Sequence, residues 1–185
     1  MARLRHRTGA GYTYFVTTRS WEGRTLFRVP EVARIVAEQI LHYRGEGFYL
    51  LHAFVIMPDH VHVLLTPGSS VTLEKAVQLI KGGSSHRVHT ERNHKMSIWQ
   101  AGFHDWTVRD EDDFRVKVAY IHSNPVKARL VEKAELWPYS SASGKFAMDE
   151  WPQGRSASSG AEAPAWQVGD VGAEAPTPQG QRQRQ

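Results

Sequence analysis

The chain is organised around one β-rich stretch, Phe54-Val55-Ile56-Met57-Pro58-Asp59-His60-Val61-His62-Val63-Leu64-Leu65. In an extended strand, side chains at positions i and i+2 leave the same face, so His60 and His62 present their imidazoles side by side. This geometry is typical of a two-histidine metal clamp. A bare His-x-His pattern is also compatible with two histidines on a half-solvated strand face, and a second segment of the chain favours the clamp.

The neighbours of this stretch predict a β-hairpin. Residues 49–57 form a near-continuous apolar run that is typical of a buried strand, and Pro58-Asp59 has the composition of a turn. The strand 60–65 follows directly. Because the connection is so short, the two strands are expected to be antiparallel, with the histidine pair beside the turn.

Strand and helix patterns flank this hairpin on both sides. Aromatic and β-branched residues predict a strand over 12–19, and apolar residues at helical spacing predict a helix over 30–44. Thr72 can cap a second helix, which Gly82-Gly83 is expected to interrupt near its middle or its end.

The last elements follow a short loop region. Residues 98–100 and 102–109 resemble two short strands of a last hairpin, and the acidic run 110–113 begins a helix that Pro125 is expected to end at Asn124. The order strand, helix, hairpin, helix, hairpin, helix predicts an α+β fold, in which helices pack on the faces of an antiparallel sheet.

Composition divides the chain into two parts. Residues 1–151 carry the apolar patterns and form one predicted domain, whereas 152–185 are rich in Gly, Ala, Pro, Ser and Gln and are predicted to be a disordered tail. The charges of the tail cancel, so the whole net charge of +4 lies in 1–151. A basic excess of this size is compatible with a polyanionic partner but is weak support for one.

Several classes of protein are excluded or disfavoured by what the sequence lacks. There is no cysteine, which excludes disulfides, thiolate metal sites and cysteine nucleophiles. No apolar run approaches the roughly 18 residues of a membrane span, and no Gly-x-x-x-x-Gly-Lys-Ser/Thr loop is present for a nucleotide triphosphate. We therefore expect a cytosolic protein with no membrane or nucleotide triphosphate partner.

The second decisive segment is Tyr120-Ile121-His122-Ser123-Asn124-Pro125. Tyr120 and Asn124 are separated by four residues, which is about 40° around a helix, so they share a face. If that face meets the histidine strand, two imidazoles, an amide oxygen and a phenol come together. A divalent ion on the first three groups has open positions for a phosphodiester, and the tyrosine oxygen can attack phosphorus.

At this point the sequence resembles the single-tyrosine HUH transposases, where U is a large apolar residue, and most closely their REP-associated tyrosine transposase branch. The resemblance covers about 12–141 and rests on four segments: 14–19, 57–64, 99–105 and 120–131. It implies a ferredoxin-like sheet with the HUH motif on a central strand and the tyrosine on a late helix.

The resemblance also implies a substrate, a cofactor and a set of site residues. It implies single-stranded hairpin DNA, Mg²⁺ or Mn²⁺, and a 5′-phosphotyrosine intermediate with a free 3′-hydroxyl. Tyr120 is then the nucleophile, His60 and His62 hold the metal, and Asn124 is a third ligand. Arg129 stands where the family commonly has glycine, which places the local turn in question.

Basic and aromatic residues near these segments are candidate DNA contacts. The cations that flank the predicted site are Lys81, Arg87, Arg109 and Lys127, although any one of them is more often a solvated charge. Among Trp99, Phe103 and Trp106 we expect at most one base-stacking residue, since aromatic residues at hairpin ends usually belong to the core.

These motifs suggest three functions. The favoured one is a metal-dependent endonuclease and strand transferase acting on single-stranded hairpin DNA. A histidine-triad nucleotide hydrolase needs a third alternating histidine, and Leu64 holds that position. A non-catalytic, domesticated nucleic-acid-binding protein of the same fold is disfavoured by the intact Tyr120. The sequence leaves open the DNA sequence recognised, the choice between monomer and homodimer, and the identity of the metal.

Overall fold

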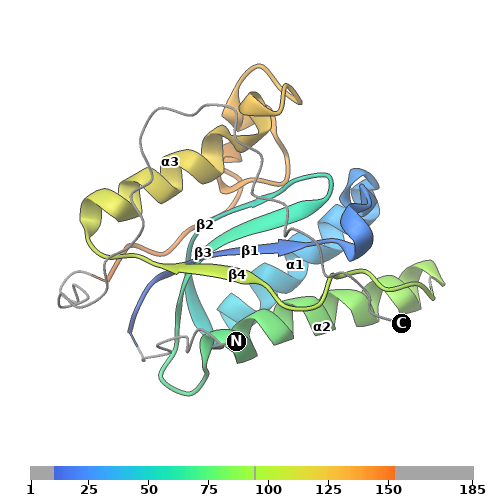
Figure 1. Ribbon diagram of the computed structural model, residues 1–185, viewed down its shortest axis with the longest axis horizontal. Helices are drawn as coiled ribbons and strands as arrows, with labels where there is room; N and C mark the ends of the chain where they lie inside the picture. Colours follow the sequence, from blue (N-terminus) through green and yellow to red (C-terminus); the bar gives the residue numbers. More distant parts are fainter. Residues whose placement is uncertain (1–10, 94, 153–185) are drawn as a thin grey trace, which may run out of the picture.

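The computed structural model describes residues 11–93 and 95–152. Figure 1 shows a four-stranded sheet with helices on both sides. In chain order its strands and α-helices are β1 (Tyr14–Arg19), α1 (Pro30–Gly45), β2 (Tyr49–Ile56), β3 (His60–Pro67), α2 (Leu73–Arg92), β4 (His104–Thr107) and α3 (Glu111–Lys127). Short 3₁₀ turns lie between β1 and α1 and after α3. No helix in this part of the chain is long and apolar enough to cross a membrane.

The sheet is antiparallel throughout, with the strand order β2-β3-β1-β4. The histidine strand β3 is therefore central, between β2 and β1. This arrangement confirms the predicted α+β class and its ferredoxin-like sheet. The hairpin β2–β3 also forms as predicted, and the Met57 N–H donates to the His60 carbonyl across the turn at 2.8 Å.

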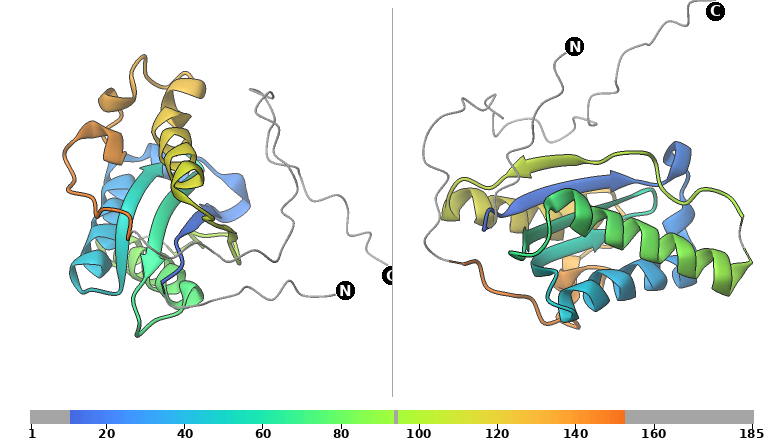
Figure 2. Two further views of the ribbon diagram at one scale, coloured as in Figure 1. Left: turned by 90° about the vertical axis from the view of Figure 1, so that its left-hand side faces the viewer. Right: turned by 90° about the horizontal axis from the view of Figure 1, so that it is seen from below.

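The two faces of the sheet are covered differently (Figure 2). Helices α1 and α2 pack on one face over the larger apolar core, and α3 crosses the other face. Alternation along β3 sends Val61, Val63 and Leu65 into the α1–α2 core. His60 and His62 consequently lie on the face that α3 covers. The alternation of side chains along β3 therefore places the two histidines on the face opposite the α1–α2 core.

The predicted interruption of the second helix at Gly82-Gly83 was wrong, because α2 is continuous from Leu73 to Arg92. Its start is as predicted, with the Thr72 hydroxyl accepting from the Lys75 N–H at 3.2 Å. A Cβ at Gly83 would clash with the side-chain oxygen of Gln39 and the hydroxyl of Tyr43 on α1. Glycine therefore lets two helices approach closely here, which offsets its low helix propensity.

The predicted end of the last helix at Asn124 was also wrong. Helix α3 continues through Pro125 to Lys127, and the Ala128 N–H closes it on the Asn124 carbonyl at 2.9 Å. Proline removes one backbone donor. Because Pro125 is near the end of the helix, the loss of this single hydrogen bond is tolerated. Arg129 follows with φ of +55°, so it keeps the left-handed turn where the family commonly has glycine.

Only one strand of the predicted last hairpin forms. Residues 104–107 pair with β1, whereas 98–100 make a single bridge between Trp99 and Ser20. Trp99 is buried in the α1–α2 core and donates its indole N–H to Ser84 at 3.0 Å. Because this ring packs against α2, residues 98–100 do not form a hairpin with β4.

The segment after α3 runs along β2, the edge strand of the sheet. The Tyr139 backbone carbonyl accepts from the Ile56 N–H at 2.9 Å, and the Asp149 N–H donates to the Leu51 carbonyl at 2.8 Å. The Asp149 carboxylate pairs with Arg44 through two bonds of 2.7 Å. The segment thereby satisfies edge backbone groups that would otherwise be open to another chain. The predicted disordered tail, 152–185, lies outside the described residues apart from Pro152.

A chain of buried and partly buried hydrogen bonds ties this segment to the sheet. The Trp151 indole donates to Thr13 Oγ1 at 3.1 Å, and Thr13 and Thr66 share a bond of 2.7 Å. His52 contacts Thr66 Oγ1 through Nε2 at 2.8 Å and the Asp149 carbonyl through Nδ1 at 3.0 Å. The carbonyl only accepts, so Nδ1 carries a proton, and in the neutral imidazole Nε2 accepts from Thr66. Burial favours this neutral form of His52 by lowering its pKa.

We expect protonation of His52 to destabilise the fold. Burial lowers the pKa of His52 below its ordinary value of 6.5, so as pH falls through that value the unfolded chain takes up a proton that the folded chain does not. The free energy of unfolding should fall with it, by up to about 1.4 kcal/mol per pH unit from this group. Urea denaturation between about pH 5 and pH 8 should show a shallower pH dependence for His52→Gln than for wild type. Equal slopes would contradict the assignment.

Candidate active site

His60 and His62 sit at the start of β3 with their rings in contact. The ring centroids are 4.7 Å apart at an interplanar angle of 73°. His60 Nδ1 contacts Asp59 Oδ1 at 2.7 Å, and His62 Nδ1 contacts Thr17 Oγ1 at 2.8 Å. For neither ring does the described part of the chain provide a hydrogen-bond partner at Nε2. One nitrogen of each imidazole is thus held by the protein and the other is left for a ligand.

The environment of His62 keeps it neutral. Its side chain is only 5% exposed, and the ring stacks on Phe15 with centroids 5.1 Å apart and planes inclined by 24°. Burial, with a smaller contribution from the neighbouring His60, lowers the pKa of His62 to about 3. A neutral imidazole is the form that ligates metals, so His62 is in that form at physiological pH.

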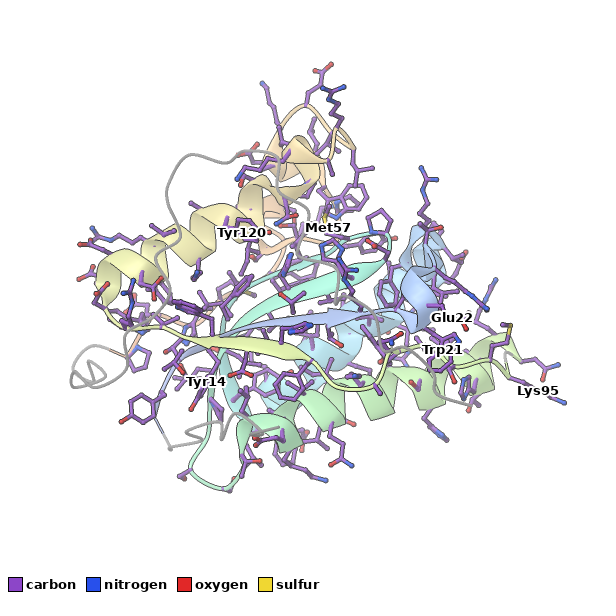
Figure 3. All side chains as sticks on the ribbon, viewed as in Figure 1. Tyr14, Trp21, Glu22, Met57, Lys95 and Tyr120 are labelled. Carbon is purple, nitrogen blue, oxygen red and sulfur yellow. The ribbon has the colours of Figure 1, made fainter. Side chains whose placement is uncertain are left out.

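Tyr120 projects from α3 toward the sheet and meets the histidine pair. Its ring lies 5.4 Å from that of His62 and 5.7 Å from that of Phe15, in both cases edge to face. Figure 3 shows Tyr120 beside the sheet on α3, while Tyr14, one residue before Phe15, lies on the α2 side. Tyr120 is 41% exposed despite these contacts, so its oxygen can be reached by a substrate. Of the four side chains expected to come together, the structure thus brings Tyr120 to His62 and His62 to His60.

Asn124 lies one turn after Tyr120 on α3, as its spacing predicts. Its Nδ2 donates to the Tyr120 carbonyl at 3.3 Å, which leaves Oδ1 without a partner in the described part of the chain. The structure shows no contact between Asn124 and either histidine. Its role as a third ligand stays a prediction.

The four predicted DNA-binding cations divide between the two faces of the sheet. Lys127 lies over the Tyr120 ring at 5.3 Å from its centroid, and Arg109 is close to the N-terminus of α3. Lys81 and Arg87 are on α2, which covers the opposite face. Lys81 donates to the carbonyls of Gln100 and Gly102 at 2.7 and 2.6 Å. The structure therefore brings only Lys127 of this set to Tyr120.

Arg87 is engaged in one ion pair between α2 and α1 and in another within α2. Its guanidinium nitrogens lie 2.9 Å from Glu38 Oε2 and 2.7 Å from Glu91 Oε1. Its proposed DNA contact would compete with two carboxylates, and that contact stays a prediction.

Some residues of the site were missed in the sequence. Lys117 is one turn before Tyr120, with Nζ 5.5 Å from the Phe15 centroid and 5.1 Å from that of Trp106. Its carboxylate neighbour, Asp113, is 3.9 Å away. Burial lowers the pKa of Lys117. Its i−3 spacing from Tyr120 was a readable signal, whereas the position of Phe15 depends on strand register. Trp106, one of the candidate base-stacking residues, lies beside Lys117.

The donor atoms fit a divalent ion held by two imidazoles. In protein metal sites a ligating histidine commonly donates its other N–H to a carboxylate or another oxygen, as His60 and His62 are placed to do here. The described residues contain no cluster of three or more His, Asp or Glu side chains suited to a metal. The amide of Asn124 stays the predicted third ligand.

Comparison with known families and proteins gives consistent matches. The family model described as "Transposase IS200 like" matches residues 21–124, which include both histidines, Tyr120 and Asn124. A REP-associated tyrosine transposase of Escherichia coli (strain K12) is 26% identical over 141 residues, or 76% of this chain and 82% of that protein. A putative REP-associated tyrosine transposase of Haemophilus influenzae (strain ATCC 51907 / DSM 11121 / KW20 / Rd) is 30% identical over 99 residues, or 48% of this chain and 56% of that protein.

A solved structure supports the fold independently. It is described as a REP-associated tyrosine transposase bound to a REP hairpin, and it matches with a TM-score of 0.64 at 24% identity. The match covers 89% of this chain and 100% of that one. At this identity the likeness establishes a shared fold.

Proposed function

The chain belongs to the IS200-like transposase family, and on that premise we propose that it cleaves and rejoins single-stranded hairpin DNA through a covalent bond to Tyr120. The observation that carries this proposal is the contact of Tyr120 with His62, which in turn contacts His60. These residues come from a central strand and from a helix 58 positions further along the chain, from His62 to Tyr120. Packing of α3 on the sheet brings them into one site.

The covalent step transfers a phosphoryl group between two oxygen atoms. The Tyr120 oxygen forms a bond to phosphorus, and the bond between phosphorus and the 3′ oxygen of the preceding nucleotide breaks. The Tyr120 proton passes to solvent, and the departing oxygen takes up a proton to become a free 3′-hydroxyl. Attack of a 3′-hydroxyl on the phosphotyrosine reverses the exchange and rejoins a strand. The energy of the broken bond is conserved, so no nucleotide triphosphate is needed.

Residues around Tyr120 would position its oxygen and bind the phosphate. The edge contacts with Phe15 and His62 hold the Tyr120 ring, and the Lys127 ammonium lies over its face. His60 and His62, with Asn124 as a third ligand, would hold Mg²⁺ or Mn²⁺, which supplies Lewis-acid polarisation of the scissile phosphodiester. The half-buried Lys117 adds a second cation on the same helix face.

The substrate class rests on the relatives. One structural relative is described as bound to a REP hairpin, and we extend hairpin DNA to this chain as its proposed substrate. Single strands expose both base faces and phosphates, which suits a site with aromatic rings and ammonium groups.

We expect binding to prefer single-stranded hairpin DNA over blunt duplex and to weaken with salt. With roughly three to five phosphate contacts, log K against log salt should have a slope of about −2 to −3.5. Fluorescence anisotropy with a labelled hairpin measures this. Equal affinity for blunt duplex, or binding that does not respond to salt, would contradict it.

A pair of variants maps the charge contribution. Lys127→Gln should reduce the magnitude of this slope by about 0.7, the value of one phosphate contact. Arg87→Gln should change it less, because its guanidinium is held by Glu38 and Glu91. A larger effect at Arg87 would show that the DNA surface extends over α2.

The direct test of the proposed function is an adduct assay. Wild-type protein, a hairpin oligonucleotide and Mg²⁺ or Mn²⁺ should give a protein–DNA species that survives denaturation and a released strand with a free 3′-hydroxyl. Tight binding of hairpins without any adduct would instead favour the non-catalytic nucleic-acid-binding alternative.

A further inference from the structure

Both histidines of the candidate metal site are held at Nδ1, by partners from different elements. Asp59 belongs to the turn that precedes β3 and contacts His60 at 2.7 Å. Thr17 lies on β1, directly opposite His62 in the antiparallel register, and contacts it at 2.8 Å. Two separate parts of the chain thus provide the same kind of contact to two neighbouring rings.

The Asp59 contact fixes the tautomer of His60. An ionised carboxylate can only accept, so the proton of a neutral His60 is on Nδ1 and the lone pair is on Nε2. Asp59 therefore leaves His60 with one nitrogen available as a ligand.

The surroundings of His62 restrict its ring in the same way. One face stacks on Phe15, and the rings of His60 and Tyr120 pack edge to face against it. The Thr17 hydroxyl can donate or accept, and when it accepts from Nδ1–H the lone pair of His62 is on Nε2.

We propose that Thr17 and Asp59 are positioning residues, which accept from Nδ1 of His62 and His60 and so fix the tautomer and ring orientation in which Nε2 can ligate a divalent cation. This inference rests on the proposed function, because it assigns the purpose of the two contacts to a metal held by the histidines. Residues that hydrogen-bond to a metal ligand in this way typically contribute 10- to 100-fold to the affinity for the metal.

A purely structural role explains the two side chains less well. The turn at Asp59 is already held by its backbone, whose carbonyl accepts from the Ser20 N–H at 2.9 Å. Thr17 is in a strand, where valine has the same shape and at least equal propensity. Neither carboxylate nor hydroxyl is needed to form these elements.

The test measures Mn²⁺ affinity of the full-length protein without DNA, by calorimetry and by electron paramagnetic resonance of free Mn²⁺. Thr17→Val and Asp59→Ala should each weaken binding about 10- to 100-fold, whereas Thr17→Ser, which keeps the hydroxyl, should stay within about 3-fold of wild type. Thr18→Val is the matched control. Thr18 is adjacent on β1 but faces the α1–α2 core, and its hydroxyl has no hydrogen-bond partner in the described part of the chain.

Nitrogen NMR of the imidazoles gives a second readout that a fold defect would not mimic. The metal-free wild type should show Nδ1 protonated and Nε2 unprotonated in both rings. Thr17→Val should give a tautomer mixture at His62 while His60 is unchanged. The midpoint of thermal unfolding of each variant shows whether it is folded. If Thr17→Val is unfolded, the comparison with wild type is made with Thr17→Ser.

The outcomes separate the two proposals. Wild-type Mn²⁺ affinity in both Thr17→Val and Asp59→Ala would overturn the positioning role and leave the proposed function standing. A wild-type protein that binds no Mn²⁺ or Mg²⁺ would overturn the metal part of the proposed function and the positioning role with it. Adduct formation that persists without a divalent ion would lead to the same conclusion.

Discussion

Tyr120→Phe is expected to fold, bind hairpin DNA with near wild-type affinity and form no covalent adduct. The substitution removes one hydroxyl and keeps the ring that packs against His62 and Phe15. Loss of a nucleophile typically reduces the chemical step by about 10⁴-fold or more, whereas loss of one exposed hydroxyl has little effect on stability. Denaturing gel electrophoresis of the reaction with labelled hairpin DNA measures the adduct directly.

Tyr139→Phe is the matched control for this experiment. Tyr139 is packed near β2, and its hydroxyl donates to the Pro30 carbonyl at 3.1 Å, outside the site. This variant should form the adduct at the wild-type rate. If Tyr120→Phe formed it instead and Tyr139→Phe did not, the nucleophile would be reassigned to Tyr139.

His60→Ala and His62→Ala are each expected to reduce cleavage at least about 100-fold, since loss of a ligand should cost no less than loss of its outer partner. DNA binding should be weakened much less, because cations such as Lys127 are retained. Asn124→Ala should do less damage, because a water molecule can replace one neutral ligand. Rates of strand cleavage across a Mg²⁺ or Mn²⁺ titration distinguish a weakened metal site from a lost one.

His42→Ala provides the control for removal of an imidazole. His42 is in the last turn of α1, on the opposite side of the sheet from Tyr120. Its loss should leave cleavage unchanged. Wild-type rates in both His60→Ala and His62→Ala would show that the metal site is misassigned.

The sequence was sufficient for the family, the fold class and the main elements of the site. Strand alternation placed His60 and His62 on one face, and helical spacing placed Tyr120 and Asn124 on one face. These are local periodicities, which depend on the backbone geometry of a single element. The family match confirms the resemblance to tyrosine transposases that these motifs indicated.

Local rules failed where contacts from elsewhere compensated for a poor propensity. Gly83 was expected to interrupt a helix, but it lies where α1 and α2 come closest. Pro125 was expected to end α3, and the helix continues because the lost hydrogen bond falls near its end. Trp99 was expected in a strand, and burial against α2 proved to be the stronger preference. Burial of a large ring outweighs the modest differences between strand and turn propensities.

Only the tertiary structure decided which side chains surround the two histidines. Thr17 and Phe15 belong to the first strand, and nothing in their local sequence shows that Thr17 pairs with His62. Lys117 enters the site because α3 crosses that face of the sheet. Register between strands 45 residues apart, as Thr17 and His62 are, is set by the packing of both faces of the sheet, and a shift of one residue would turn Thr17 away from His62. The sequence by itself thus determined the candidate reacting groups, and long-range strand pairing and helix packing determined what holds them in place.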